Sequence, residues 1–379
     1  MKRKEALRIG RFITLCQRMK DPRRVWGNKR HQLTDILVIA LLAIICGCEG
    51  WDDIRDYGLT KIDWLRTFLP LTNGIPSEST FHRVFALIAP EALEAVYREW
   101  VSPYVGTCFG KQLCIDGKTS RGVLKRGDSN LHMVSTWVRE DQITLGQMKT
   151  AAKSNEIIAI PELLRTLDIR GSIVTIDAMG CQKTIARCIR ENEAHYVLAV
   201  KENHPTVLAE IKEYFNWGLN DPIEKNQIDC FSHIDFEHGK TTKWRVFSTT
   251  DTVWFESKKE WEGLSCFVMV ECTRIVKGVT STKCRYYISS LVADAKCLHQ
   301  IIRGHWHVEN RLHWMLDVAF REDHSLIHKG NAPQNLSLLR KMALAMLAQD
   351  SSRTASIARK RKMAGWDNDY ALSIISMEV

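Results

Sequence analysis

The chain has 379 residues, of which 45% are hydrophobic and 26% are charged, so it can bury a large core in two or three domains. This composition excludes a disordered protein. The longest apolar run, residues 36–48, is shorter than the ~20 residues that a bilayer span needs, so we expect a buried helix and no membrane anchor. The basic N-terminus is not followed by the apolar segment of a signal peptide, which predicts a cytoplasmic protein.

The positive charge is concentrated at one end of the chain. Residues 1–30 contain eleven Lys or Arg but only Glu5 and Asp21, which accounts for the whole formal net charge of +9. A second basic cluster, Arg359 to Lys362, lies near the C-terminus. Basic ends are typical either of a phosphate-binding arm or of a solvated tail. The twelve cysteines include no C-x-x-C pair, which argues against a zinc finger.

Residues 1 to about 100 are predicted to be helical, because apolar residues recur at helical spacing and no strand pattern occurs before Gln112. The last of these helices, Ser77 to Ile88, would direct Ser79, His82 and Arg83 outward. Two interpretations of this helix remain open. It fits a DNA recognition helix of the helix-turn-helix type, and it equally fits a bundle helix with a solvated face.

From Lys111 onward the pattern changes to strands and helices in the order β-β-β-α-β-α-β, which predicts a mixed sheet with helices on its faces. The predicted strands are residues 113–116, 131–138, 143–149, 173–177 and 196–200. A β-rich insertion follows, with strands at 244–248, 253–255, 266–275 and 284–291. After it we expect a helical stretch around Glu309, an amphipathic helix at 333–347, and a less ordered basic tail.

Three acidic residues stand out against this background. Asp116 and Asp177 each end a short apolar run, and Glu309 lies in an apolar helical stretch. A carboxylate on the inward side of a helix is unfavourable unless a cation or hydrogen bonds compensate it. Two Asp at strand ends and one helical Glu therefore predict a metal site for phosphodiester chemistry.

Each acid also has a simpler explanation when it is considered alone. Asp177 could cap the helix that follows it, and Asp116 with Gly117 could form a turn. Glu309 could pair with a histidine four residues away on either side. The metal-site interpretation rests on the three acids taken together.

Several motifs occur in the same order as in a known family. They are Leu33 to Leu37, Gly74 to Ser77, Ile115 to Lys118, Lys153 to Glu156, Thr175 to Gln182, His305 to Asn310, Leu312 to Trp314 and Leu316 to Val318. With these motifs the chain resembles the H-repeat-associated transposases of bacterial insertion sequences, a DDE family, over nearly its whole length.

The resemblance implies an α/β fold, namely a ribonuclease-H-like mixed sheet with flanking helices and a β-rich insertion, preceded by an all-helical N-terminal domain. It implies domains at 1–105 (helical, DNA-binding), at 106–350 (catalytic, with the insertion at about 216–290) and a basic tail at 351–379. Asp116, Asp177 and Glu309 would be catalytic and would bind two Mg²⁺ ions, with Mn²⁺ as a substitute. The partners would be double-stranded DNA, as inverted-repeat ends and as target, and further copies of the chain in a homodimer or higher oligomer.

The chain departs from related DDE transposases around the third acid. Those proteins carry Tyr seven and Arg four residues before the catalytic Glu and Lys seven residues after it, whereas this chain has Ile302, His305 and Leu316. Other basic or polar residues are therefore candidates for DNA contacts, and near the acids these are Lys118, Arg121, Lys201 and Asn203. Exposed turn charges are an equally good interpretation of Lys118 and Arg121.

Three rival functions remain open. A zinc hydrolase could use His305, His307, His313, His324 and His328, although their spacing lacks the H-E-x-x-H motif. A transposase descendant could bind DNA without cutting it. A metal-dependent nuclease could cut DNA without joining strands.

Overall fold

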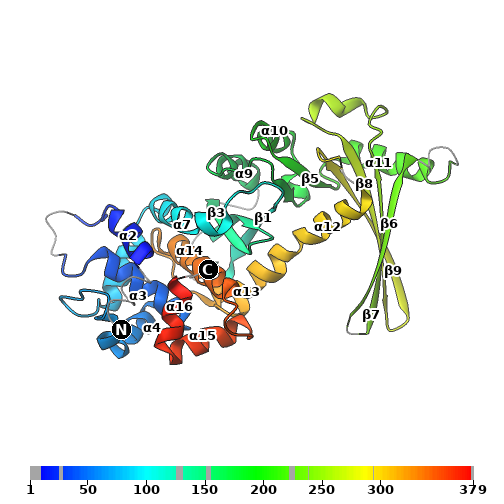
Figure 1. Ribbon diagram of the computed structural model, residues 1–379. Coiled ribbons are helices and arrows are strands. Elements are labelled where there is room, and N and C mark those ends of the chain that lie inside the picture. The colour runs from blue at the N-terminus through cyan, green and yellow to red at the C-terminus, as the bar shows by residue number, and fades with distance from the viewer. Residues whose placement is uncertain are drawn as a thin grey trace.

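The computed structural model describes residues 10–24, 29–124, 131–150, 155–221, 227–237, 239–292 and 294–376 (Figure 1). These residues form one nine-stranded sheet in the order β3-β2-β1-β4-β5-β9-β8-β7-β6. A lobe of helices lies at one end of the sheet, and helix α12 (Ala295–His305) runs diagonally from the far strands back toward that lobe (Figure 1). No helix in the described parts of the chain is long and apolar enough to cross a membrane.

The first five strands follow the predicted pattern. They are β1 (Gln112–Ser120), β2 (Leu131–Val138), β3 (Ile143–Thr150), β4 (Ile173–Ile176) and β5 (His195–Val200). Strands β1 to β3 are antiparallel, whereas β4 and β5 run parallel to β1 because helices α9 (Glu156–Arg165) and α10 (Lys183–Glu191) return the chain between them. The strand order 3-2-1-4-5 with this pattern of directions is that of the ribonuclease-H-like fold, so the predicted fold class is confirmed.

The predicted insertion extends the same sheet. Strand β9 (Val279–Ser289) pairs with β5, and β8 (Cys266–Val276), β7 (Lys240–Thr249) and β6 (Asp229–Glu237) follow outward. The prediction missed β6 because it is an edge strand without a buried apolar face. It also missed helix α11 (Pro205–Gly218), whose apolar residues recur at helical spacing. The strand predicted at 253–255 is wrong, since a turn there leads into the short helix η4 (Glu256–Glu260).

The N-terminal region is helical, as predicted. Its elements are α2 (Gly10–Arg18), α3 (Leu33–Ile45), α4 (Trp51–Thr60), α5 (Ile62–Leu65), α6 (Glu78–Leu87) and α7 (Pro90–Val105). Helix α14 (Ala332–Gln349) contacts α3, α6 and α7 and also strand β3. The helix predicted at 333–347 is confirmed, but it is not amphipathic. Because α14 lies between the lobe and the sheet, even Arg340 and Lys341 are buried.

Residues 357–376 are folded, which corrects the prediction of a basic tail for this part of the chain. Helices α15 (Ile357–Trp366) and α16 (Asn368–Ser376) pack against α3 and α14. Two members of the basic cluster, Lys360 and Arg361, are buried. The Arg361 guanidinium donates hydrogen bonds to the carbonyls of Ile44 (2.8 Å) and Cys48 (3.3 Å), at the end of α3. Helix C-termini have unpaired carbonyls, and a buried cation there satisfies them.

Replacing Arg361 should therefore destabilise the protein. The Arg361→Met substitution removes the guanidinium donors to the Ile44 and Cys48 carbonyls, and with them the cation that lies 4.1 Å from the Phe320 ring centroid. We expect the free energy of unfolding, measured by urea denaturation, to fall by about 2–3 kcal/mol. The exposed Arg359 in the same helix provides the matched control. Arg359→Met should change the free energy of unfolding by less than about 0.5 kcal/mol. Equal effects of the two substitutions would contradict this role of Arg361.

Candidate active site

The three acids lie around one cavity of about 560 Å³, although they are far apart in the sequence. Strands β1 and β4 are parallel neighbours, and their last paired residues are Ile115 and Ile176, so Asp116 and Asp177 follow side by side. Glu309 approaches from the helical segment after α12. Asp177 follows its strand as predicted, but Asp116 lies within β1, because β1 continues to pair with β2 beyond the point where β4 stops.

The pKa of Asp116 is raised from its ordinary value to about 7. Burial is the main cause and the negative charges of Asp177, Glu309 and Glu156 add to it, while the hydrogen bond that the Gly117 N–H donates to the carboxylate acts in the opposite direction. Like charges that share a small cavity favour the protonated form of one of them. A bound cation would remove this repulsion, so the arrangement has the electrostatic character of a cation site.

Asp177 also has the simpler role considered from the sequence. Its Oδ1 accepts a hydrogen bond from the Met179 N–H (3.1 Å) and caps the short helix η2 (Ala178–Gly180). Asn203, a predicted DNA contact, donates through Nδ2 to the Ala178 carbonyl at 2.7 Å and so holds the turn after Asp177. Lys201 lines the cavity, whereas Asn203 is not among its described lining residues.

The structure departs from both interpretations of Lys118. Its side chain is only 12% exposed, and Nζ lies 2.7 Å from Asp317, 3.2 Å from Glu322 and 3.1 Å from Asp323. An ammonium engaged by these carboxylates is neither an exposed turn charge nor a free phosphate contact. Arg121, at the start of the short helix α8 (Arg121–Leu124), is 81% exposed and remains a predicted DNA contact.

Comparison with known proteins places this geometry in a family. Residues 13–101 match the family described as DDE_Tnp_1-associated, and residues 108–346, more than half of the chain, match the Transposase DDE domain. The chain belongs to the DDE transposases. The family predicted from the sequence motifs is thus confirmed.

Relatives of this transposase cover almost its whole length. "Putative transposase YncI" of Escherichia coli O157:H7 is 38% identical over 93% of this chain and 91% of its own. "H repeat-associated putative transposase YhhI" of Escherichia coli strain K12 is 35% identical over 94% of this chain and 95% of its own. Among solved structures, a piggyBac transposase synaptic complex with hairpin DNA matches with a TM-score of 0.44 and 14% identity, over 98% of this chain and 80% of that one.

The predicted recognition helix of this transposase is α6. It buries Phe81, Val84 and Phe85, and it leaves Ser79 and Arg83 exposed, as predicted, but His82 half-buried. The Arg83 Nε donates to the Ser79 carbonyl, so the two form one polar surface on the helix. None of these outward residues is among the described residues that line the cavity, and a DNA contact of α6 would be separate from the acids.

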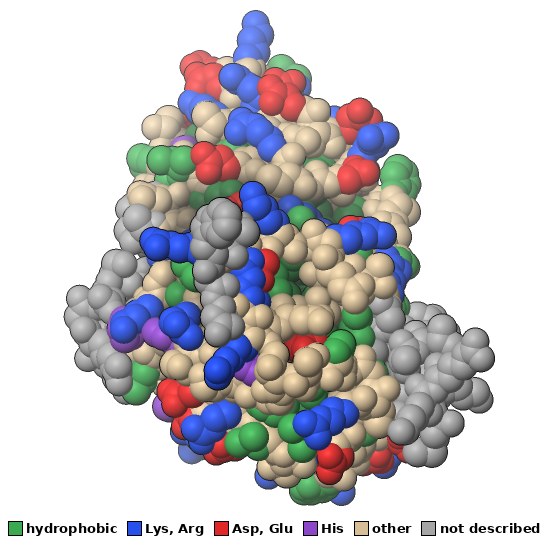
Figure 2. Space-filling view, turned by 90° about the vertical axis from the view of Figure 1, so that its left-hand side faces the viewer, with side chains coloured by type: hydrophobic (Ala, Val, Ile, Leu, Met, Phe, Trp, Pro, Cys, Tyr) green, Lys and Arg blue, Asp and Glu red, His purple; other side chains and the backbone are tan. Residues whose placement is uncertain are grey.

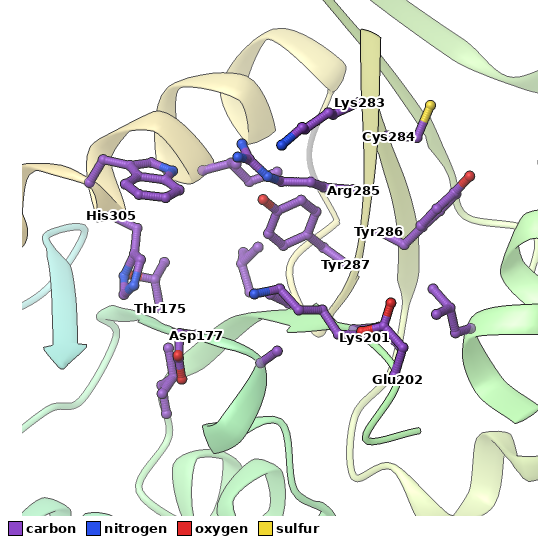
Figure 3. A pocket seen from close by; sticks show the side chains of 18 of the residues that line it. Thr175, Asp177, Lys201, Glu202, Lys283, Cys284, Arg285, Tyr286, Tyr287 and His305 are labelled. Carbon is purple, nitrogen blue, oxygen red and sulfur yellow. The ribbon is translucent and has the colours of Figure 1, made fainter. Parts of the chain in front are cut away.

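Three basic residues that line the cavity were not predicted from the sequence. Lys212 of α11 and Lys283 and Arg285 of β9 line it, together with Trp306. Lys283, Arg285 and Tyr287 extend from one face of β9 into the cavity that Lys201 and Asp177 also line (Figure 3). The period-2 alternation of these residues in β9 was the available signal, but which face of β9 meets the acids depends on its pairing with β5.

The histidines of the zinc alternative do not gather in the described parts of the chain, where no three His, Cys, Asp or Glu are placed to hold one ion. The Nδ1 of His305 lies 3.0 Å from Thr175 Oγ1 (Figure 3), and that of His313 lies 3.4 Å from Asp116 Oδ2. Burial lowers the pKa of His305 to about 4 and that of His313 to about 3, so both are neutral. The three acids line one cavity, but they too are not placed to hold one ion together.

Proposed function

We propose that this transposase cuts DNA at the ends of an insertion sequence and transfers the cut strand to target DNA, by metal-dependent phosphodiester chemistry at Asp116, Asp177 and Glu309. The supporting observation is that two parallel strands and one helical segment bring these acids to a single cavity, in the order Asp, Asp, Glu along the chain. The raised pKa of Asp116 adds to this, because it marks carboxylates that a cation would stabilise.

The carboxylates fit hard divalent cations, since Mg²⁺ and Mn²⁺ prefer oxygen ligands. Asp116, Asp177 and Glu309 would hold the ions through their carboxylate oxygens. Two ions bound there would supply activation of the attacking hydroxyl and stabilisation of the leaving 3′-oxygen.

Basic residues of the cavity would hold the DNA backbone. Lys201, Lys212, Lys283 and Arg285 line the same cavity as the acids, so phosphates on either side of the scissile bond would meet Lys or Arg. On the face formed by the helical lobe, Lys and Arg side chains gather across the middle, while Asp and Glu lie mainly above and below (Figure 2).

The remaining DNA contacts and the assembly are part of the same proposal. The helical region at 1–105 would bind the inverted-repeat ends through Ser79, His82 and Arg83 of α6, and Arg121 would contact the flanking backbone. The catalytic region at 106–350 would act within a homodimer or higher oligomer that holds two ends and the target DNA. The protein would work in the cytoplasm, on the DNA of the nucleoid.

The metal requirement tests this function. Purified protein and DNA carrying the repeats that flank its gene should give strand cleavage with Mg²⁺ or Mn²⁺. Ca²⁺, with longer and looser coordination, should support DNA binding without cleavage. A zinc-selective chelator added with excess Mg²⁺ should have no effect. Protein that carries stoichiometric zinc and cuts independently of Mg²⁺ would contradict the carboxylate mechanism.

Product analysis in the same assay separates the rival functions. Joined products that contain target DNA support a transposase, whereas linear products alone indicate a nuclease without strand transfer. Binding without any product indicates a DNA-binding descendant.

A further inference from the structure

Two contacts join the segment that carries Glu309 to strand β1. His313 Nδ1 lies 3.4 Å from Asp116 Oδ2, and Asp317 Oδ1 lies 2.7 Å from Lys118 Nζ. Asp116 and Lys118 are two residues apart in a strand and therefore point to the same side. His313 and Asp317 are four residues apart in a helical segment and also share a face. One face of the strand and one face of the helical segment can therefore make both contacts at the same time.

The helical segment has an unusual turn at this place. Residues Val308–His313 form a π-helix (η5) between α12 and helix α13 (Trp314–Val318), and the Trp314 N–H donates to the Glu309 carbonyl, five residues back. Short π-helical turns are rare and are frequent at functional sites. Because Glu309 and His313 belong to this one turn, a contact that holds His313 also holds Glu309.

A buried ionic network stabilises the Lys118 end. Lys118 also meets Glu322 and Asp323 of the short helix η6 (Glu322–His324), and Glu322 faces Arg340 of α14 at 4.0 Å. The side chains of Lys118, Glu322 and Arg340 are 12%, 6% and 5% exposed. These contacts hold the Lys118 side chain in position, because a displaced Lys118 would leave buried charges without partners, at a high cost in free energy.

The imidazole of His313 is directed at Asp116. Its Nε2 is buried and has no hydrogen-bond partner among the described residues, so its polar contact with the site is through Nδ1. A carboxylate only accepts hydrogen bonds, and the tautomer with hydrogen on Nδ1 is therefore the one that stabilises the ionised Asp116.

We propose that His313, Asp317 and Lys118 are positioning residues that set the separation between Asp116 and Glu309 and thereby the affinity of the site for a divalent cation. The proposal rests on the proposed function, because it takes these acids as the metal ligands. Groups that orient ligands typically change metal affinity 10- to 100-fold when they are removed. Nothing in this arrangement requires His313 or Asp317 to touch DNA.

Binding of Mn²⁺ to the full-length protein without DNA tests the proposal directly, by calorimetry or electron paramagnetic resonance. His313→Phe and Asp317→Ala should each weaken Mn²⁺ binding by about tenfold or more. The conservative variants His313→Asn and Asp317→Asn should retain most of the affinity, since Asn keeps an N–H donor or an oxygen acceptor. His307→Phe is the matched control in the same segment, because His307 is not among the described lining residues of the cavity.

A double substitution distinguishes positioning from a general loss of negative charge. If Asp317 acts through the placement of Glu309, Asp317→Ala should have little further effect on Mn²⁺ affinity in a Glu309→Gln background. Additive effects of the two substitutions would overturn the proposal. So would a folded His313→Phe protein that binds Mn²⁺ as tightly as the wild type, even if its melting temperature is lower.

The same titration separates failure of this inference from failure of the proposed function. Mn²⁺ binding that survives Asp116→Asn unchanged would show that the acids are not the metal site, and both proposals would fall. Loss of binding in Asp116→Asn together with normal binding in His313→Phe would overturn only the positioning role. If the Phe or Ala variants do not fold, the double substitution His313→Asn, Lys118→Met carries the test: we expect weaker Mn²⁺ binding, and a normal Mn²⁺ affinity overturns the proposal.

Discussion

Asp116→Asn, Asp177→Asn and Glu309→Gln should each reduce DNA strand cleavage by roughly a thousandfold, because each removes a carboxylate that stabilises charge in the transition state through a metal ion. Binding of the same DNA should persist or tighten, since each substitution removes a negative charge from a cavity that is to receive phosphates. Cleavage of end-containing DNA and binding by electrophoretic mobility shift measure the two effects.

The matched control for these substitutions is Glu162→Gln, which alters an exposed acid of α9 outside the described lining of the cavity. It should leave cleavage unchanged. Near-normal Mg²⁺-dependent cleavage by any one of the three variants would remove that residue from the active site, whereas loss of DNA binding in parallel with cleavage would point to misfolding.

The stability of the metal-free protein should fall as the pH rises from about 4 to about 7. The folded-state pKa of Asp116, raised from 3.8 to about 7, means that the folded protein holds a proton that the unfolded chain has released over this window. Unfolding then releases a proton, so raising the pH favours the unfolded state, and above pH 7 the loss is complete. We expect a loss of about 4 kcal/mol from Asp116, since one pKa unit corresponds to about 1.4 kcal/mol.

Urea denaturation in EDTA at pH 5 and pH 8 measures this loss. Burial also raises the pKa values of Asp35 and Glu94, to about 6 and about 7, so the difference between wild type and Asp116→Asn isolates the contribution of Asp116. Asp116→Asn should be more stable than wild type at pH 8 and not at pH 5. Mg²⁺ at pH 8 should stabilise the wild type alone. Identical pH dependence of the two proteins would show that the pKa of Asp116 is not raised in the folded protein.

Sequence patterns predicted the first half of the sheet because each of its strands buries apolar side chains that are visible as a run or an alternation. Strand β6 was not predicted because it is the edge strand of the sheet and is mostly exposed, so its sequence lacks the apolar pattern of a buried strand. The C-terminal helices were predicted to be a tail because a cluster of basic residues is usually exposed to solvent. Arg361 is in fact the partner of carbonyls at the end of α3, more than 300 residues earlier.

The identities and order of Asp116, Asp177 and Glu309 were determined by the sequence itself, because two of these acids end short apolar runs and the third lies in an apolar helical stretch, and both are local signals. The roles of the charged residues around them were decided only by the tertiary structure. Lys118 and Lys283 are the same residue type and both lie in strands, yet the first is buried among carboxylates and the second lines the cavity. Whether a charge is paired or free depends on segments that meet only after folding, and the free energy of a charge depends on those partners and on its exposure to water.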